Sequence, residues 1–306
     1  MFRSPSFALF LAFAMDLLFG ELPNRSHPVA WIGRAIAWAQ PQLMSGSRWR
    51  LRVTGAALVI TLGGGAATLA WALTEAASRL GVVGLALEAL ALKTTFSIRR
   101  LGCAALDVAA RLEHGDLPAA RFAVGYHLVS RETAGLDAGH VASAAVESVA
   151  ENLTDSVVAP LVFFLVFGLS GAVAYRVVNT ADAMLGYRRG ALEDFGKASA
   201  RLDDLLNVVP ARLAATLLAL VASAAGGRTG TALRMMWRDG ALTASPNAGW
   251  TMAAMAGALG VTLEKEGAYR LGDGDLPGPA DIRRSVVVFA MSVGLVGLLS
   301  LIALAL

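Results

Sequence analysis

Runs of hydrophobic residues alternate with polar segments along the whole chain. The apolar runs cover residues 7–20, 53–73, 80–92, 157–175, 213–227 and 285–306. A helix that crosses a bilayer needs roughly 20 apolar residues, whereas runs of 10–14 are more often buried or re-entrant. By length, 53–73 and 285–306 therefore predict membrane-spanning helices, and 7–20, 80–92 and 213–227 need neighbouring residues to lengthen them.

The arginines in the polar segments predict which side of a membrane each segment faces. Positive residues are concentrated in 21–52 and 97–155, while the turn at 74–80 carries only Arg79. Under the positive-inside rule, the first two segments lie inside, and the N-terminus and the turn lie outside. The first apolar run contains Asp16 and is followed by no cleavage motif, so we interpret it as a retained helix rather than a signal peptide.

The later segments do not fit simple crossings. The basic segment 176–204 also belongs inside, yet only the run 157–175 separates it from another inside segment. The two glycines of "GLSG" at 168–171 permit a tight reversal, so 157–175 is predicted to enter the membrane and return, and 213–227 is expected to do the same. Broken helices at membrane depth are found where they line a cavity.

Composition supports this assignment. Of 306 residues, 56% are hydrophobic and 16% are charged, against about 25% charged in soluble domains. We predict an all-α integral membrane protein formed as one domain over 1–306, with about four to six spanning helices, re-entrant or broken helices, and an inside-facing polar cavity. The net charge of +3 is too small to indicate nucleic acid, and the single cysteine, Cys103, excludes an internal disulfide.

Three acids recur every four residues in "AVESVAENLTDS". Glu147, Glu151 and Asp155 fall within an arc of about 80° on one helix face, although like charges at this spacing destabilise an isolated helix. Carboxylates without nearby His or Cys suit a hard cation such as Mg²⁺, which takes one or two carboxylates plus phosphates and waters. The alternative is a solvated face paired with arginines.

Further polar clusters follow. "YRVVNTADAMLGYRRG" (175–190) and "FGKASARLDDLLNVVPAR" (195–212) combine acids, amides and bases, which is typical either of metal and phosphate binding or of an internal salt-bridge network. "SPNAGW" (245–250) presents Asn247 before an apolar helix, whose N-terminus could receive an anion. The glycines of "LGGGAATLA" (62–70) lack the P-loop pattern and are expected to let helices approach closely.

Five segments together carry a resemblance to a known family. "DLLFGELPNRSHPVAWIGR", "AAVESVAENLTDSVVAPL", "AYRVVNTADAMLGYR", "FGKASARLDDLLNVVPARL" and "ASPNAGWTMAAMAGALGV" closely resemble the CobD/CbiB family of cobalamin biosynthesis proteins, over roughly residues 11–272. The resemblance implies an adenosylcobinamide-phosphate synthase in the bacterial inner membrane, with its active site facing the cytoplasm. Such an enzyme joins a carboxylate of adenosylcobyric acid to the amine of aminopropanol phosphate or threonine phosphate, with ATP and Mg²⁺.

This activity assigns hypothetical roles to the polar clusters, with 97–155 and 176–204 as the cytoplasmic-side catalytic segments. The catalytic candidates are Glu147, Glu151, Asp182 and Asp203, and the metal candidates are Glu151, Asp155, Asp182, Asp203 and Asp204. The substrate-binding candidates are Asn152, Asn179, Asn247, Arg188, Lys197, Arg201, Arg212 and His27. A homo-oligomer or an assembly with other membrane enzymes of the pathway is a further expectation. The alternative function is a non-catalytic membrane carrier or sensor of corrinoids.

Overall fold

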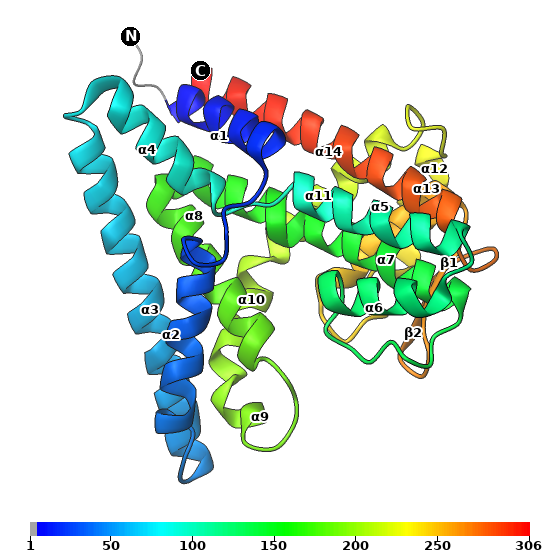
Figure 1. Ribbon diagram of the computed structural model, residues 1–306, viewed down its shortest axis with the longest axis horizontal. Helices are drawn as coiled ribbons and strands as arrows, with labels where there is room; N and C mark the ends of the chain where they lie inside the picture. Colours follow the sequence, from blue (N-terminus) through cyan, green and yellow to red (C-terminus); the bar gives the residue numbers. More distant parts are fainter. Residues whose placement is uncertain (1–4) are drawn as a thin grey trace. The chain divides into compact units, whose positions relative to one another are not determined.

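The computed structural model describes residues 5–306, which fold mainly into helices (Figure 1). Two compact units are formed, one from 5–97, 159–207 and 300–306, and the other from 98–158 and 208–299. Because the chain passes repeatedly from one unit to the other, no linear boundary marks them in the sequence. The expectation of one integral membrane domain stays a prediction.

The first unit is built from seven helices among the described residues. They are α1 (Pro5–Phe19), α2 (Pro28–Leu43), α3 (Arg48–Ala77), α4 (Gly81–Lys93), α8 (Ala159–Leu185), α9 (Leu192–Phe195) and α10 (Lys197–Leu206). Local signals explain where two of them begin. Ser47 accepts a hydrogen bond from the backbone N–H of Arg50 at the start of α3, and Pro28 occupies the first position of α2.

The core of the first unit lies where α2, α3, α8 and α9 meet. Ile36, Leu58, Leu185 and Phe195 are buried in it. Gly55 of α3 allows α9 to approach closely, because a Cβ atom at this position would overlap the carbonyl oxygen of Phe195. The short helix α9 is thereby held directly against the long helix α3.

Helix α8 is broken at Gly168, as the "GLSG" motif predicts. Gly168 has φ 65° and ψ −159°, a conformation that glycine adopts without steric strain. The two arms then pack together, since the rings of Phe163 and Tyr175 stack with centroids 5.2 Å apart. In a continuous helix, residues twelve positions apart are separated by about 18 Å. The break is confirmed, whereas a path in and out of the same membrane face stays a prediction.

The glycines at 63–65 of α3 are not a site of close helix packing, although the sequence suggested this. A Cβ atom added at Gly63, Gly64 or Gly65 would meet no other atom within 4 Å. These three glycines therefore do not bring two helices of the described chain into close contact, so the expected close packing of the small residues of 62–70 is not found at the glycines.

The second unit contains the remaining elements. They are α5 (Arg99–Glu113), α6 (Leu117–His127), α7 (Ala138–Leu153), the π-helical turn η1 (Thr154–Val158), α11 (Val208–Val221), α12 (Thr229–Asp239), α13 (Ala248–Leu259), β1 (Thr262–Lys265), β2 (Tyr269–Gly272) and most of α14 (Pro279–Ala305). Asp116 and Asp137 cap α6 and α7 by accepting backbone N–H groups of the first turn. Nearly every residue of α13 is buried, so this helix forms the centre of the unit.

The all-α fold class is confirmed, and one short β-hairpin accompanies the helices. Strands β1 and β2 are antiparallel, with Leu263 opposite Leu271, and both leucines are fully buried. Gly267, with φ 70°, lies in the connection. Alternating residues around a glycine-containing turn are a hairpin signal, but the four-residue strands are too short to stand out beside the apolar helices.

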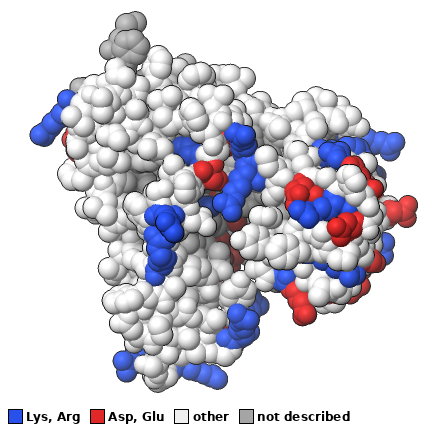
Figure 2. Space-filling view, viewed as in Figure 1, with Lys and Arg blue, Asp and Glu red and all other residues white. Residues whose placement is uncertain are grey.

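Three helical stretches are long and apolar enough to cross a membrane, namely Arg48–Ala77, Ala138–Leu185 and Pro279–Ala305. A fourth arises if α10 and α11 together form one broken span. In α3 no charged residue lies between Arg52 and Glu75, and Figure 2 shows the matching uncharged surface over this helix. The block 213–227 does not reverse within itself, because it forms the end of α11 and then a turn. The number of crossings stays a prediction.

Candidate functional site

A basic pocket lies in the first unit, at the end of α8 and along α9 and α10. It is a cavity of about 270 Å³ lined by Arg188, Lys197 and Arg201, together with Glu193 and Asp204. The three cationic side chains are exposed, so a ligand in solution can reach them. Helix α10 begins at Lys197, and no side chain caps its N-terminus. The structure thus brings together three predicted phosphate-binding residues and one predicted metal ligand.

A buried hydrogen-bond network connects α8 and α10 in the same unit. The carboxylate of Asp203 accepts from the amide nitrogens of Asn179, at 3.2 Å, and Asn207, at 3.0 Å. Asn207 in turn accepts from the hydroxyl of Tyr175, at 3.0 Å, and Arg176 donates to Asn179. Each oxygen of Asp203 is therefore engaged by an amide. A carboxylate can accept about four hydrogen bonds or ligand contacts in all, so the catalytic and metal-binding roles of Asp203 stay predictions.

The two other acids predicted on these helices differ from Asp203. Asp204 is half-buried and lines the basic pocket, because adjacent residues on a helix point in different directions. Asp182 lies one turn before Gly186 and its carboxylate lies beside the backbone of Gly186. Gly186 lines the pocket, whereas Asp182 does not.

In the second unit, Glu147 is 4% exposed and fully engaged. It accepts hydrogen bonds from the hydroxyls of Ser143 (2.7 Å) and Tyr269 (2.8 Å) and from Arg131 (3.1 Å). Burial, and then the charge of Glu147, raise the pKa of Tyr269, so its hydroxyl stays protonated and continues to donate. Ser143 also accepts the backbone N–H of Glu264 in β1. Glu147 therefore fastens the β-hairpin to α7.

The predicted row of three acids is divided by this network. Glu151 and Asp155 are half-buried and still reach the surface, unlike Glu147. Asp155 lies in the π-helical turn η1, where the wider helix changes the angular spacing that the sequence argument assumed. Asn152 interacts along its own helix, donating to Ser148 and accepting from Ser156.

Arg212 and Asn247, which come from two predicted motifs, interact directly. The guanidinium group of Arg212 donates to the side-chain oxygen of Asn247 at 2.5 Å and lies 4.6 Å from the ring centroid of Trp250. The N-terminus of α13 is already capped, since Ser245 accepts from Asn247 and Ala248. The expected anion site at this helix end therefore has fewer donors than the sequence suggested.

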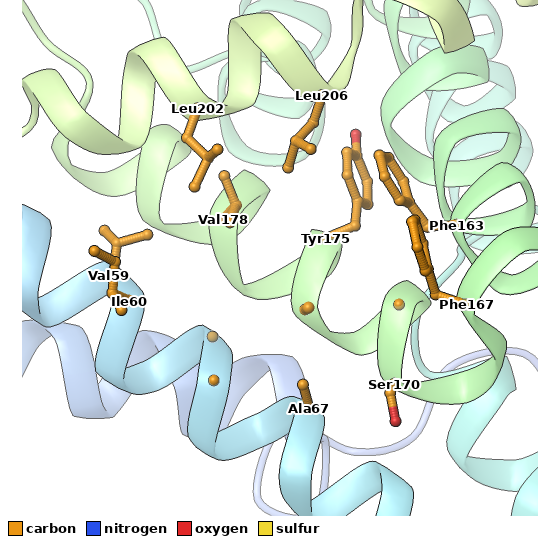
Figure 3. A pocket seen from close by; sticks show the side chains of 14 residues that line it. Val59, Ile60, Ala67, Phe163, Phe167, Ser170, Tyr175, Val178, Leu202 and Leu206 are labelled. Carbon is orange, nitrogen blue, oxygen red and sulfur yellow. The ribbon is translucent and has the colours of Figure 1, made fainter.

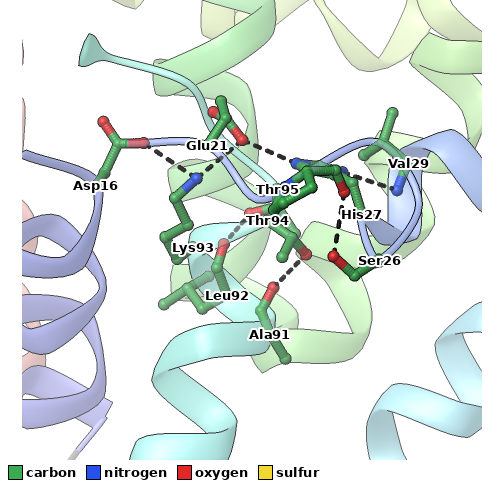
Figure 4. Close-up of polar contacts among 11 residues, drawn as sticks. Asp16, Glu21, Ser26, His27, Val29, Ala91, Leu92, Lys93, Thr94 and Thr95 are labelled. Atoms are coloured by element: carbon green, nitrogen blue, oxygen red, sulfur yellow. Dashed lines mark hydrogen bonds and ion pairs between the residues drawn. The ribbon is translucent and has the colours of Figure 1, made fainter. Parts of the chain in front are cut away.

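The first unit contains a buried charge cluster that the sequence did not predict. Lys93, only 2% exposed, lies 2.8 Å from the carboxylate of Glu21 and 3.4 Å from that of Asp16 (Figure 4). His27 is held here too, because Nε2 contacts Glu21 at 2.8 Å and Nδ1 accepts the backbone N–H of Val29. Both ring nitrogens are thus engaged within the chain, and His27 caps α2.

Electrostatics favours the charged form of Glu21 in this cluster. Burial alone would raise the pKa of its carboxylic acid, but hydrogen bonds from His27 and Lys93 and the charge of Lys93 together lower the pKa to about 2. The signals that could have found the cluster are a lysine at the end of an apolar run and Asp16 within another, because ionisable residues in apolar segments are seldom accidental.

No group of three or more His, Cys, Asp or Glu side chains suited to hold a metal ion is found within 5–306. Mg²⁺ normally uses only one or two carboxylates and completes its shell with phosphates and waters. Four of the predicted ligands are partly exposed carboxylates, namely Glu151, Asp155, Asp182 and Asp204, whereas Glu147 and Asp203 are buried. The predicted metal site stays a prediction.

The protein is mainly helical and of membrane type, because three helical stretches are long and apolar enough to span a bilayer. Its pocket with three cationic side chains is suited to bind an anionic ligand. The chain belongs to the CobD/Cbib protein family, whose model matches residues 9–289. It therefore belongs among the cobalamin biosynthesis proteins.

Individual relatives agree. The chain is 45% identical over 265 residues to the cobalamin biosynthesis protein CobD of Dehalococcoides mccartyi, covering 86% of this chain and 85% of that protein. It is 42% identical over 265 residues to a probable cobalamin biosynthesis protein CobD of Methanothermobacter thermautotrophicus, covering 87% and 86%. No solved structure matches the chain.

Proposed function

We propose that the protein is an adenosylcobinamide-phosphate synthase, which forms an amide between adenosylcobyric acid and aminopropanol phosphate or threonine phosphate. Membership of the CobD/Cbib family supports this reaction, and the basic pocket is the observation that carries it. In the proposed reaction, ATP phosphorylates the carboxylate to an acyl phosphate. The amine then attacks the acyl carbon, inorganic phosphate leaves, and ADP remains from the first step.

The charges of the basic pocket suit the amine substrate. Arg188, Lys197 and Arg201 present three positive charges to a phosphate group, and arginine can bind it with two parallel hydrogen bonds. Glu193 and Asp204 on the same pocket are placed to bind an ammonium group. A cavity of about 270 Å³ lies just below the usual range of about 300–1,000 Å³ for ligand pockets, which favours a small phosphorylated amine over a nucleotide.

Other residues have proposed supporting roles. Glu151 and Asp155 would hold Mg²⁺, which supplies positive charge to neutralise phosphate oxygens during transfer. The Asp203 network would keep α10, and with it Lys197 and Arg201, in position along α8. Asn152 and the Arg212–Asn247 pair have amide and guanidinium groups suited to the peripheral amides of a corrinoid.

The direct test is turnover by the purified protein. We expect adenosylcobinamide phosphate, detected by mass spectrometry, when adenosylcobyric acid, aminopropanol phosphate, ATP and Mg²⁺ are all present. Omission of ATP or addition of a chelator should abolish the product. If corrinoid binds but no product forms, with threonine phosphate also tried, the protein is instead a corrinoid carrier or sensor.

We propose that the basic pocket faces the cytoplasm of a bacterial cell. One end of α3 carries three arginines, Arg48, Arg50 and Arg52, whereas only Arg79 lies just beyond the other end. By the positive-inside rule, the end with three arginines is the inside end. Arg52 pairs with Asp194 of α9 at 2.7 Å, and α9 borders the basic pocket. The pocket therefore belongs to the inside end of α3.

Labelling of single cysteines checks this orientation. In a Cys103→Ser background, Lys197→Cys should react with an impermeant maleimide in inside-out vesicles and resist it in right-side-out vesicles. Leu80→Cys, at the opposite end of α3, should show the reverse pattern. Reaction of both cysteines from the same side would contradict the proposed orientation.

A further inference from the structure

An apolar cavity of about 460 Å³ lies between α3, α8 and α10 of the first unit (Figure 3). Helix α3 contributes Val59, Ile60 and Ala67, and the two arms of the broken helix α8 contribute three aromatic rings. Leu202 and Leu206 of α10 close a third side. The cavity is separate from the basic pocket, and the proposed function leaves it without a role.

Two glycines of α3 leave this cavity open. Gly63 and Gly64 line it, and a Cβ atom at either would meet no atom within 4 Å. Glycine is less favourable than alanine in the interior of a helix. At Gly63 and Gly64 no close helix contact offsets this lower helix stability. What the two glycines provide is free space beside the helix.

The lining excludes water and polar ligands as the normal contents. Ser170 carries the only hydroxyl besides that of Tyr175, and the Tyr175 hydroxyl already donates to Asn207. Buried water needs two to four polar partners, and a corrinoid amide or a nucleotide would leave its polar groups without hydrogen bonds. Only a hydrocarbon group matches such walls.

The position of the cavity along α3 identifies the source of that hydrocarbon. The residues from Val59 to Ala67 surround the middle of this 30-residue helix, which is about 45 Å long against a hydrocarbon thickness of about 30 Å. The cavity is therefore at mid-bilayer depth. Two residues of the cavity lining, Ile60 and Phe167, are 69% and 64% exposed. At this depth, exposed apolar side chains face the hydrocarbon of the bilayer.

We propose that the cavity is a binding site for one acyl chain of a bilayer phospholipid, left open by Gly63 and Gly64 and by the break of α8 at Gly168. The bound chain contacts the ring of Tyr175. Because that residue donates to Asn207 in the Asp203 network, the lipid also supports the packing of α8 against α10.

Photolabelling in vesicles tests this site. The protein is reconstituted in phosphatidylethanolamine and phosphatidylglycerol with a small fraction of phosphatidylcholine that carries a diazirine near the middle of one acyl chain. After irradiation, we expect label on peptides containing Val59–Ala67 and Phe163–Val178, above the level on the exposed Leu69 of the same helix. Uniform labelling along α3 would show only surrounding bulk lipid and would overturn the proposal.

A matched pair of variants sharpens the test. Gly64→Leu fills the cavity, whereas Gly65→Leu places the same side chain on the next residue, which does not line it. We expect Gly64→Leu to lose most of the label on Phe163–Val178 and Gly65→Leu to retain it. Equal labelling of the two variants would overturn the proposal. If Gly64→Leu does not fold, Ala67→Leu fills the same cavity and is compared with Gly65→Leu in its place.

Discussion

Replacement of Arg188 by alanine is expected to lower kcat/KM for the phosphorylated amine by about tenfold to a hundredfold, because a hydrogen bond to a charged group is worth about 1.5–3 kcal/mol. Arg188 is exposed in the basic pocket, so its loss should leave the fold intact. Steady-state kinetics with the amine varied and ATP saturating measures the effect. The same variant should leave the KM for ATP nearly unchanged if the pocket holds the amine substrate.

The adjacent arginine provides the control. Arg189 has the same charge and is also exposed, but it lies over the ring of Tyr187 and does not line the pocket. Arg189→Ala should keep near-normal kcat/KM. If both alanine variants lose the same amount, the effect comes from general positive charge. If only the KM for ATP rises in Arg188→Ala, the pocket binds nucleotide and our assignment of the amine is wrong.

Arg201→Lys distinguishes paired hydrogen bonds from simple charge at this pocket. Arginine binds phosphate with a planar pair of donors, while lysine acts as a point charge. A lysine that restores full kcat/KM after the loss seen in Arg201→Ala would indicate that only charge matters there.

Long elements and breaks were predictable from the sequence because their signals are local. The apolar run 53–73 lies within α3, and the run 285–306 covers most of α14 up to its end. Gly168 breaks α8 because glycine tolerates a positive φ. Arg188, Lys197 and Arg201 were substrate-binding candidates because they lie within two short motifs, and that role stays a prediction. The structure adds that they share one pocket with Asp204.

The sequence predictions failed where the outcome depends on contacts between residues that are far apart in the chain. In the sequence, the three acids at 147, 151 and 155 look equivalent along one regular helix. In the structure, Glu147 accepts a hydrogen bond from Tyr269, which lies 122 positions away, and a π-helical turn changes the place of Asp155. The glycines at 63–65 suggested close packing, but whether a second helix fills the space beside them depends on the whole fold. Pairing of Asn179 with Asp203 likewise depends on how α8 packs against α10.

Lys93 is the clearest case of a contact that a local stretch of sequence does not predict. In the sequence, Lys93 directly follows the apolar run 80–92 and precedes the basic segment 97–155, and no neighbouring residue indicates its partners. Glu21 lies 72 positions away, and Asp16 is part of a different apolar run. The structure instead shows a lysine that is almost inaccessible and lies between two carboxylates, so its main effect should be on stability.

Lys93→Met is therefore expected to destabilise the protein by about 3–5 kcal/mol, because removal of one partner leaves buried charge without compensation. For a chain of 306 residues, this corresponds to a fall of about 5–8 °C in Tm. Thermal unfolding in detergent, followed by tryptophan fluorescence, measures it. Lys197→Met is the control in the same unit: Lys197 is exposed, and its loss should change stability by only about 0.5 kcal/mol.

The combined variant Asp16→Asn, Glu21→Gln, Lys93→Met separates lost charge compensation from lost packing. Without the carboxylates, a methionine at position 93 faces neutral groups, so much of the lost stability should return. If the triple variant is as unstable as Lys93→Met, the aliphatic packing of the lysine, rather than its charge, holds α1 and α4 together.

The pH dependence of stability follows from the same cluster, with Glu21 as the reporter. Its pKa is about 2 in the folded protein, below the usual 4.5, so the folded state favours the ionised form. The stabilisation is present above pH 4.5 and is lost as the pH falls from 4.5 towards 2. The Tm difference between the wild type and Glu21→Gln should therefore be largest near pH 6 and shrink below pH 4.5. A difference that stays constant across this range would show that the ionisation of Glu21 does not stabilise the cluster.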